Sequence, residues 1–484
     1  MASSEVAPFA KVGGLADMVS GLSKSLKKSG HDVRIIMPYY KDIHLDKKKL
    51  KTVLTPMGVH MGGGAEEWCA VHVFFLEGDP SVQVYFIEHH YYFNRSGIYF
   101  DRWGEFGDNA KRFAFFCLAV CQFCRDLPFK PDVIHCHDWP TSLIPAYLKL
   151  WYPFDPILGR CASVLTIHNI GYPGTFPKDF WTYLGLPAHS FCEAQFESWN
   201  QISFLKGGIY YADKLTTVSP FHAMEVRTPE GGKGLAPYLN RRGSDLFGIL
   251  NGADYDIWNP ETDPFLPANY SEKDLTGKAS CKKELQKRFG LEINPDRPIF
   301  GVIARLTFQK GLDLLMQIVH SLFSEMLLQI IVLGDGESYL VSGIHYFTRI
   351  YPGRFGSYIG YNEELSHLIE AGSDFFLMPS LYEPCGLNQF YSLRYGTLPV
   401  VRATGGLVDT VGNYDEATGG GTGFIFHEPS PRALYYTIGW AVSTWYDRPK
   451  HIHKMISRAM KKRFDWERSS KEYTLLYEAA VRRK

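Results

Sequence analysis

The sequence predicts an α/β protein with two doubly wound, Rossmann-like domains that face each other across a deep cleft. Short apolar segments alternate with longer helical segments in both halves of the chain. A stretch rich in Gly, Asn and Pro at 250–268 interrupts this alternation once. With 484 residues, the chain is long enough for two domains of ordinary size.

The apolar segments are the expected strands. Between several of them lie helical stretches at 110–125 and 141–151. Continuous apolar strands that alternate with helices indicate parallel sheets covered on both faces. The expected strands are 33–37, 71–76, 82–87, 133–137, 164–167 and 215–218 in the first half, and 299–304, 328–333, 356–359, 375–378 and 398–401 in the second.

The domain boundary is expected where the periodicity stops. Asn251-Gly252 opens this stretch, and Pro260, Pro264 and Pro267 follow. We therefore predict one domain over 1–250 and a second over 251–465. Ligands of such folds bind beyond the carboxyl ends of the strands, so we look for the site in the loops that follow them.

Composition and charge exclude several classes of function. The 51 basic side chains balance 51 acidic ones, which gives no electrostatic reason to expect a nucleic-acid partner. No apolar run approaches the roughly 18 residues of a membrane span, and the first residues resemble neither a signal nor a transit peptide. Nine scattered cysteines fit a reducing compartment. We expect a bacterial cytoplasm, or a plastid stroma after removal of a transit peptide.

Two Gly-Gly loops are candidates for phosphate binding. Gly13-Gly14 precedes an amphipathic helix, and Gly405-Gly406 follows the expected strand 398–401. Glycines allow the backbone to approach a phosphate closely, and a helix start directs N–H groups towards it. Either pair could instead be an ordinary tight turn.

Three charged residues follow buried strands. Arg305 and Lys310 come after the strand 299–304, and Glu383 comes after the strand 375–378. Two cations at this spacing could hold a diphosphate, and a carboxylate there could bind sugar hydroxyls. The alternatives are plain surface cations and a carboxylate that stabilises a helix start.

Taken together, the motifs resemble the bacterial and plant glycogen (starch) synthases, the retaining GT-B glycosyltransferases of family 5. The matching segments keep the family's order from residue 4 to about residue 425. They are Ser-Glu-Val-Ala-Pro at 4–8, Lys-Val-Gly-Gly-Leu-Ala-Asp at 11–17, His-Cys-His-Asp-Trp at 135–139, Thr-Ile-His-Asn at 166–169, Phe-Leu-Lys-Gly-Gly-Ile at 204–209, Gly-Ile-Leu-Asn-Gly at 248–252, the segment 305–313, Glu-Pro-Cys-Gly-Leu at 383–387, Arg-Tyr-Gly-Thr at 394–397 and Thr-Gly-Gly-Leu at 404–407.

The resemblance assigns roles to individual residues. The catalytic group would be Glu383, Lys310, Arg305, His168 and Lys11. The donor would be bound by Lys11, Gly14, Asn251, Arg305, Lys310, Tyr361, Cys385, Gly386, Leu387, Thr404, Gly405 and Gly406, with Tyr361 stacking on the adenine. The acceptor glucan would be contacted by Glu5, Asp138, Trp139 and Asn169.

The implied reaction is glucose transfer from ADP-glucose to the non-reducing end of an α-1,4-glucan, with retention of configuration. ADP-glucose is then a substrate, and no cofactor or metal is implied. The implied partners are the sugar nucleotide and a glycogen or starch chain; the resemblance indicates no oligomeric state. A UDP-glucose-dependent retaining GT-B transferase, or an impaired glucan-binding relative, is the alternative. The presence of Lys11, Arg305, Lys310 and Glu383 favours an active enzyme.

The two ends of the chain carry further expectations from the resemblance. The family opens with a strand of which only Met1-Ala2-Ser3 remains here, so we expect a shortened first strand and a disturbed loop around Lys11. A helix over 466–484 should cross back to the first domain. Because the expected donor groups are divided between the two halves, we expect the cleft to close during the reaction.

Two metal-site interpretations are weaker. Cys117, Cys121 and Cys124 have the spacing of an iron–sulfur motif, but their segment contains no Gly or Pro and is expected to be a buried helix. His135 and His137 could be two metal ligands on one strand face, but the sequence offers no third, so a role lining the cleft is favoured.

Overall fold

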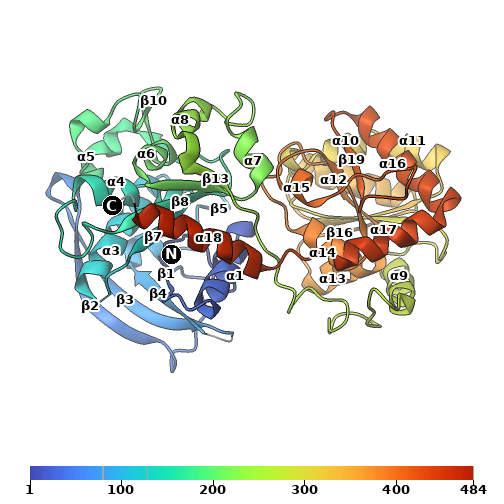
Figure 1. Ribbon diagram of the computed structural model, residues 1–484, viewed down its shortest axis with the longest axis horizontal. Helices are drawn as coiled ribbons and strands as arrows, with labels where there is room; N and C mark the ends of the chain where they lie inside the picture. Colours follow the sequence, from blue (N-terminus) through green and yellow to red (C-terminus); the bar gives the residue numbers. More distant parts are fainter. Residues whose placement is uncertain (79–80, 128, 483–484) are drawn as a thin grey trace. The chain divides into compact units, whose positions relative to one another are not determined.

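The computed structural model describes residues 1–78, 81–127 and 129–482. The chain forms two compact units (Figure 1). Unit 1 comprises Met1–Gly252 and Trp466–Lys484, and unit 2 comprises Ala253–Asp465.

Unit 1 contains two four-stranded sheets, with strand orders β1-β4-β3-β2 and β13-β12-β8-β7. Its strands are β1 Arg34–Pro38, β2 Lys51–His60, β3 Glu66–Leu76, β4 Val82–Glu88, β5 Phe100–Asp101, β6 Gly104–Glu105, β7 Val133–His137, β8 Ala162–Ile167, β9 Thr175–Pro177, β10 Glu197–Ser198, β11 Gln201–Ser203, β12 Lys214–Thr217 and β13 Leu246–Gly248. Its helices are α1 Gly14–Lys28, α2 His90–Phe93, α3 Asn109–Asp126, α4 Ile144–Leu150, α5 Trp181–Leu184, α6 Phe204–Tyr211, α7 Pro220–Glu225, α8 Ala236–Arg241 and α18 Trp466–Val481.

The first residues connect the two sheets of unit 1. Ala2 forms parallel bridges with Ile36 of β1 and Cys136 of β7, and its N–H donates to the His135 carbonyl at 2.8 Å. Met1–Ser3 thus occupy the position of a strand between β1 and β7. The short first strand that the sequence predicts therefore pairs with both sheets.

The apolar pattern predicts parallel strands throughout unit 1, but one of its strands is antiparallel to its neighbours. β3 pairs antiparallel with both β2 and β4. Its residues alternate between buried and accessible positions, which is typical of a sheet with one face towards solvent. The apolar segment 71–76 is only the better buried end of this longer strand. Its pattern therefore predicted a strand but gave no sign of the antiparallel pairing with β2.

Helix α18 packs on unit 1 although it lies at the far end of the sequence. It contacts α1, β7 and β8, and Figure 1 shows it lying across these elements. Trp466 is buried where Gly21 of α1 and Gly252 leave space: a Cβ on Gly21 would lie 2.1 Å from the Trp466 Nε1 atom. Trp466 can approach the backbone this closely because glycine has no side chain.

Unit 2 is a six-stranded parallel sheet with helices on both faces (Figure 1) and the order β16-β15-β14-β17-β18-β19. Its strands are β14 Ile299–Ile303, β15 Gln329–Gly334, β16 Phe355–Ile359, β17 Phe375–Met378, β18 Leu398–Arg402 and β19 Phe424–Phe426. Its helices are α9 Thr276–Arg288, α10 Leu312–Met316, α11 Val319–Glu325, α12 Ser338–Ile350, α13 Glu363–Gly372, α14 Asn388–Arg394, α15 Gly406–Thr410, α16 Pro431–Asp447 and α17 Pro449–Lys461. The five strands predicted for this half are confirmed.

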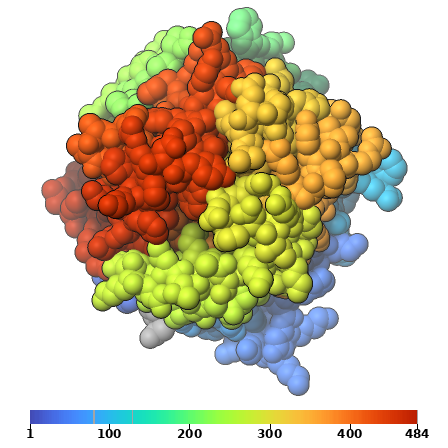
Figure 2. Space-filling view, turned by 90° about the vertical axis from the view of Figure 1, so that its right-hand side faces the viewer, coloured from blue at the N-terminus to red at the C-terminus, as the bar shows by residue number. Residues whose placement is uncertain are grey.

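Distant segments of unit 2 meet on its surface. Figure 2 shows one face, where chain from around residue 280 (yellow-green) lies near chain beyond residue 430 (red-orange). Trp445 of α16 donates its indole N–H to the Asp296 carbonyl at 2.8 Å, and the Lys282 ammonium lies 4.8 Å from the Trp445 ring. These contacts tie α16 to the segment that leads into the sheet. Among the helices of the described residues, none is long and apolar enough to cross a membrane.

Candidate active site

Three neighbouring strands of unit 2 bring the predicted charged residues together. β14, β17 and β18 are adjacent and parallel, so their carboxyl ends share one edge of the sheet. Arg305 and Lys310 follow β14, Glu383 follows β17, and Thr404 follows β18. The structure thus places all four residues at one edge of the sheet, while their roles in binding and catalysis stay predictions.

The centre of this cluster is an ion pair. Lys310 Nζ lies 2.6 Å from Glu383 Oε2. The Ser380 hydroxyl donates to the same carboxylate oxygen at 2.9 Å, and Glu383 is only 5% exposed. A buried carboxylate needs such partners because losing its hydration is costly. The pair can neutralise Glu383 while two N–H groups of Lys310 stay available for other oxygens.

The second Gly-Gly loop lies directly against Glu383. Gly405 has a φ of +45°, and a Cβ at this position would lie 1.9 Å from the Glu383 carbonyl oxygen. A Cβ on Gly406 would lie 2.3 Å from the Cys385 carbonyl oxygen. Because Gly405 and Gly406 have no side chains, the loop 404–406 can pack closely against the segment 383–385. The same two glycines leave bare backbone beside the ion pair.

Arg305 and Tyr361 extend this site along the sheet edge. The Arg305 side chain is exposed and forms no ion pair or hydrogen bond within the described residues. Tyr361 follows β16 and is 77% exposed. β16 lies two strands from β14, about 10 Å at the usual strand spacing. An exposed cation and an exposed ring are therefore arranged in the order that a nucleoside diphosphate would require.

In unit 1, the predicted loop before α1 is held by Glu5. Its Oε2 atom accepts the N–H groups of Val12 at 2.6 Å and Gly13 at 3.1 Å, and the Tyr99 hydroxyl donates to Oε1 at 2.7 Å. Glu5 is buried. The carboxylate therefore organises the glycine loop; its predicted contact with an acceptor stays a prediction. Lys11, half-exposed on the same loop, pairs with Asp17 at 2.8 Å.

Asp138 fixes the backbone of two predicted site residues. Its Oδ1 atom accepts the N–H groups of His168 at 2.7 Å and Asn169 at 3.3 Å. Asp138 itself has a φ of +55° and a ψ of −172°, a strained backbone conformation that few residues other than glycine adopt. Burial raises the pKa of this carboxyl to about 7, although the two backbone N–H groups lower it.

The imidazole of His168 contacts a second histidine. His137 Nδ1 lies 3.1 Å from His168 Nε2. Burial lowers the pKa of His168 to about 3 and that of His137 well below its usual value, so both rings are neutral at neutral pH. Asn251, also predicted for the donor site, is 5% exposed, and its Oδ1 atom has no hydrogen-bond partner within the described residues.

Trp139 packs among other aromatic rings. Its ring centroid lies 4.9 Å from Phe113 and 5.4 Å from Phe176. Gly174, with a φ of +60°, approaches it so closely that a Cβ would lie 2.8 Å from the Trp139 side chain. Its predicted contact with a glucan would therefore involve only the part of the residue that remains accessible.

Sequence reasoning missed several supporting residues. Ser380 bonds Glu383, Asn388 donates to the Ile303 carbonyl at 2.7 Å, and Arg402 donates to the carbonyls of Ser380 and Leu381 at 2.8 and 2.6 Å. Arg402 ends β18 beside the cluster, a position that could have indicated its role. Nothing in the sequence indicated Tyr99, because its partner Glu5 is 94 positions away.

The two metal-site interpretations are not supported by the geometry. Cys117, Cys121 and Cys124 lie in helix α3 with buried side chains, so the predicted helix is confirmed. Both ring nitrogens of His135 are hydrogen-bonded, Nδ1 to the Tyr477 hydroxyl at 2.8 Å and Nε2 to the Thr166 hydroxyl at 2.6 Å. Within the described residues, no three His, Cys, Asp or Glu side chains are grouped to hold a metal ion.

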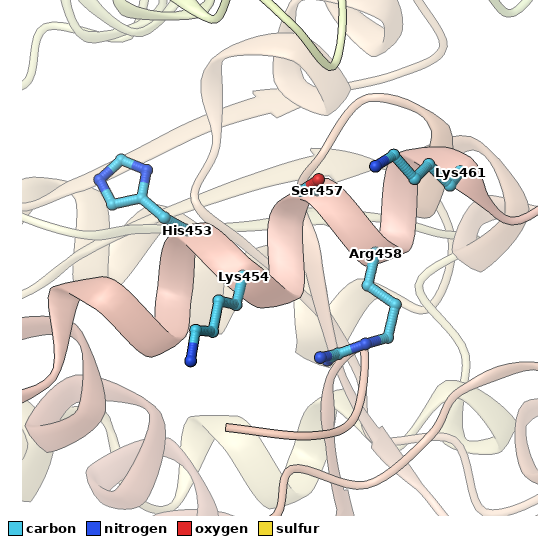
Figure 3. Close-up of a pocket in the computed structure, with 5 residues that line it drawn as sticks. All are labelled: His453, Lys454, Ser457, Arg458 and Lys461. Carbon is cyan, nitrogen blue, oxygen red and sulfur yellow. The ribbon is translucent and has the colours of Figure 1, made fainter. Parts of the chain in front are cut away.

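An open hollow of unit 2 lies elsewhere, along α17. Figure 3 shows its lining, with Lys454 and Arg458 extending to the same side of the helix. The Arg458 guanidinium donates to the carbonyls of Gly419 and Gly421. The lining residues are His453, Lys454, Ser457, Arg458 and Lys461. None of the predicted site residues is among them.

Comparison with known proteins agrees with this arrangement. The family model of the starch synthase catalytic domain matches residues 1–241, and that of glycosyl transferases group 1 matches residues 283–462. The glycogen synthase of Treponema denticola is 47% identical over 100% of this chain and 98% of its own length. Glycogen synthase 1 of Geobacter metallireducens is 45% identical over 100% of this chain and 96% of its own.

Solved structures give the same result. The catalytic domain of starch synthase IV from Arabidopsis thaliana, bound to ADP and acarbose, has a TM-score of 0.90 and 34% identity and covers 99% of this chain and 98% of its own. Sucrose-phosphate synthase from Thermosynechococcus elongatus has a TM-score of 0.63 at 15% identity over 100% of this chain and 98% of its own, a likeness of fold. The chain therefore belongs to the glycogen (starch) synthase family of GT-B glycosyltransferases.

Proposed function

We propose that this glycogen/starch synthase transfers glucose from ADP-glucose to the non-reducing end of an α-1,4-glucan, with retention of configuration. The observation that carries the proposal is the ion pair of Lys310 with the buried Glu383 beside the backbone of 404–406, at the carboxyl ends of three adjacent strands. This edge combines a fixed carboxylate, cations and bare backbone, which are the groups that a departing diphosphate and a sugar require.

Unit 2 binds the nucleotide part of the donor. Lys310 bridges Glu383 and a phosphate oxygen, and the exposed Arg305 binds the diphosphate with its planar guanidinium. Thr404 and the two following glycines contribute backbone at the same edge, beside Cys385, Gly386 and Leu387. Metal-independent transfer follows in this scheme because side-chain cations compensate the phosphate charge.

Unit 1 contributes groups for the sugar and the acceptor. Lys11 and Gly14 lie on the loop that Glu5 orders, and His168, Asn169 and Asn251 present polar atoms near the ends of β8 and β13. Asp138 keeps the backbone of 168–169 in place. As the family resemblance implies, we assign Lys11, Gly14, His168 and Asn251 to the donor, with His168 and Asn251 beside its glucose. The acceptor side is assigned to Glu5, Asp138, Trp139 and Asn169.

The bond changes are those of a front-face displacement. The bond between the anomeric carbon and the β-phosphate oxygen breaks, and a bond to the acceptor 4-hydroxyl oxygen forms on the same face. The acceptor proton passes to the departing phosphate, so the products are ADP and a glucan longer by one glucose. The side chains act by positioning and by stabilising charge.

Tyr361 supports adenine as the base. An exposed aromatic side chain gains contact area when a base stacks on it, and such stacking contributes about 1–3 kcal/mol. The Arabidopsis enzyme, whose structure contains ADP, supports the same choice. A purine offers a larger stacking surface than a pyrimidine, so ADP-glucose should be preferred to UDP-glucose.

A donor comparison tests this proposal. Initial rates of nucleotide release are measured with glycogen as acceptor, with ADP-glucose and with UDP-glucose, each with and without EDTA. We expect faster transfer from ADP-glucose, no effect of EDTA, and a KM for ADP-glucose raised about tenfold or more in Tyr361→Ala. Tyr436→Ala, at another exposed ring, is the control. Preference for UDP-glucose, or a strict need for a divalent ion, would contradict the proposal.

A further inference from the structure

Three imidazoles lie close together at the ends of β7 and β8. His137 is the last residue of β7, and His168 directly follows β8. Their rings are 5.3 Å apart and are joined by the contact between His137 Nδ1 and His168 Nε2 at 3.1 Å. The ring of His135 lies 4.1 Å from that of His137. The resemblance and the proposed function use only His168 from this cluster.

The protonation state of the cluster restricts its hydrogen bonds. Burial lowers the pKa of all three rings, so each is neutral at neutral pH. A neutral imidazole has one N–H donor and one bare acceptor nitrogen. The contact between His137 and His168 therefore needs a proton on one ring and a lone pair on the other, and two arrangements are possible.

The other nitrogen of His137 decides between them. His137 is fully buried, and its Nε2 atom has no hydrogen-bond partner within the described residues. If Nε2 carried the proton, a buried N–H would have no acceptor, whereas a bare nitrogen in that place is better tolerated. His137 is therefore protonated on Nδ1 and donates to His168 Nε2.

The consequence falls on His168. Because its Nε2 accepts, its single proton is on Nδ1, for which no hydrogen bond exists among the described residues. His168 is only half-buried, unlike His137. The ring thus presents an N–H donor. The backbone N–H of His168 donates to the Asp138 carboxylate at 2.7 Å, and this bond fixes the backbone from which the ring projects.

His135 keeps the donor ring in position. Both of its nitrogens are engaged, by Tyr477 of α18 and by Thr166 of β8. Thr166 is linked in turn to the Thr216 hydroxyl at 2.6 Å. With its own ring fixed from two sides, His135 packs against His137 and holds its plane.

We propose that His137 is a positioning residue that sets the tautomer of His168, so that His168 Nδ1–H donates a hydrogen bond to an oxygen of the transferred sugar. This rests on the proposed function, in which His168 contacts the donor glucose. A ring in the opposite tautomer would present a bare nitrogen, which can only accept a hydrogen bond and cannot donate one to a sugar oxygen. Wrong tautomers are known to be costly where a histidine acts in catalysis.

The test compares His137→Asn with His137→Leu. The Asn amide can place an N–H where Nδ1 lies, whereas Leu fills the buried space without any donor. We expect His137→Leu to lower kcat by about 10–100-fold with an unchanged melting temperature, and His137→Asn to restore most of the turnover. A residue that acted only by packing would give the reverse order, since an apolar side chain suits a buried position better. That order would overturn the proposal.

A second measurement reads the tautomer directly in the resting protein. In protein labelled with ¹⁵N-histidine, the His168 signals, assigned by their loss in His168→Asn, should show a protonated Nδ1 and a bare Nε2. In His137→Leu this pattern should change. A protonated Nε2 in the wild-type protein would overturn the inference, whatever the activity. Failure of the proposed function would appear separately, as absence of glucosyl transfer in a protein with the expected tautomer.

Discussion

At the scale of single residues, the site depends on charges that are kept in buried positions. The Glu383 carboxylate contacts Lys310, in the loop after β14, and Ser380, in its own loop after β17. Removing one partner would leave a buried charge without compensation, which costs more than the pair itself contributes.

The Lys310–Glu383 pair gives the first prediction. Lys310→Ala and Glu383→Ala should each lower turnover by at least about a hundredfold, because each removes a preorganised group at the reacting centre. Lys310→Ala should also lower the melting temperature, since the buried carboxylate loses its partner. Steady-state kinetics and thermal unfolding measure the two effects.

The double variant Lys310→Met/Glu383→Gln separates stability from catalysis. It removes both charges and keeps the volume, so the melting temperature should recover while turnover stays low. Lys454→Ala on α17, outside the predicted site, is the control for a lost surface cation. Near-normal turnover in either single variant would mean that the reacting centre lies elsewhere.

Asp138 gives a prediction about pH. Its pKa of about 7 in the folded protein lies above the value of 3.8 for an unperturbed carboxyl. Between these values the folded protein holds a proton that the unfolded chain has lost. The contribution of Asp138 to stability is therefore largest at low pH and is lost as the pH rises through about 7.

Asp138→Asn cannot ionise and keeps an oxygen for the two backbone N–H groups. Its melting temperature, compared with that of the wild type, should therefore rise between about pH 4 and about pH 7 and stay level at higher pH. Asp132→Asn, at an exposed position, serves as the control and should show a constant difference. If the difference for Asp138→Asn were also independent of pH, the raised pKa would be wrong.

At the scale of elements, the two Gly-Gly loops differ in why they need glycine. Gly405 has a positive φ, and a Cβ added to it would collide with the Glu383 carbonyl oxygen. Gly13 has an extended backbone and open space around its Cβ position. Gly405→Ala should therefore lower both the melting temperature and turnover. Gly13→Ala should fold normally but raise the KM for the donor, because its methyl group projects from the loop that carries Lys11 and Gly14, which are assigned to the donor. A normal KM in Gly13→Ala would remove that loop from the donor site.

Helix α18 allows a prediction with a control on the same element. Trp466 is buried against α1, and Leu475 is 66% exposed. Trp466→Ala should lower the free energy of unfolding by about 3–5 kcal/mol, as expected for a buried aromatic side chain. Leu475→Ala should change it by less than about 0.5 kcal/mol. Denaturant unfolding checks both, and equal effects would contradict the observed packing of α18.

The burial of each strand explains why some strands could be predicted from the sequence and others could not. Strands such as β7, β14, β17 and β18 are continuous apolar runs, so their positions were clear. β2 was missed because it is largely accessible and contains Pro56, and without it β3 was placed in a parallel sheet. Only the fold determines these antiparallel neighbours.

At the scale of the whole molecule, the sequence predicted which residues follow which strands, and adjacency in the sheet of unit 2 then brought Arg305, Lys310 and Glu383 to one edge. Contacts between remote segments could not be predicted. Tyr477 and His135 are 342 positions apart, and no local pattern joins a helix at the end of the chain to a strand near its start. The tautomer of His168 depends on such contacts.

The most direct test of the central claim is the configuration of the bond that the protein makes. ADP-glucose labelled with ¹³C at the anomeric carbon is incubated with a short maltooligosaccharide, and the product is examined by NMR in parallel for the wild type and Glu383→Ala. The account predicts a labelled glucose joined by an α-1,4 linkage at the non-reducing end, formed at a rate at least about a hundredfold lower in the variant. A β-linked product, or equal rates for the two proteins, would contradict it.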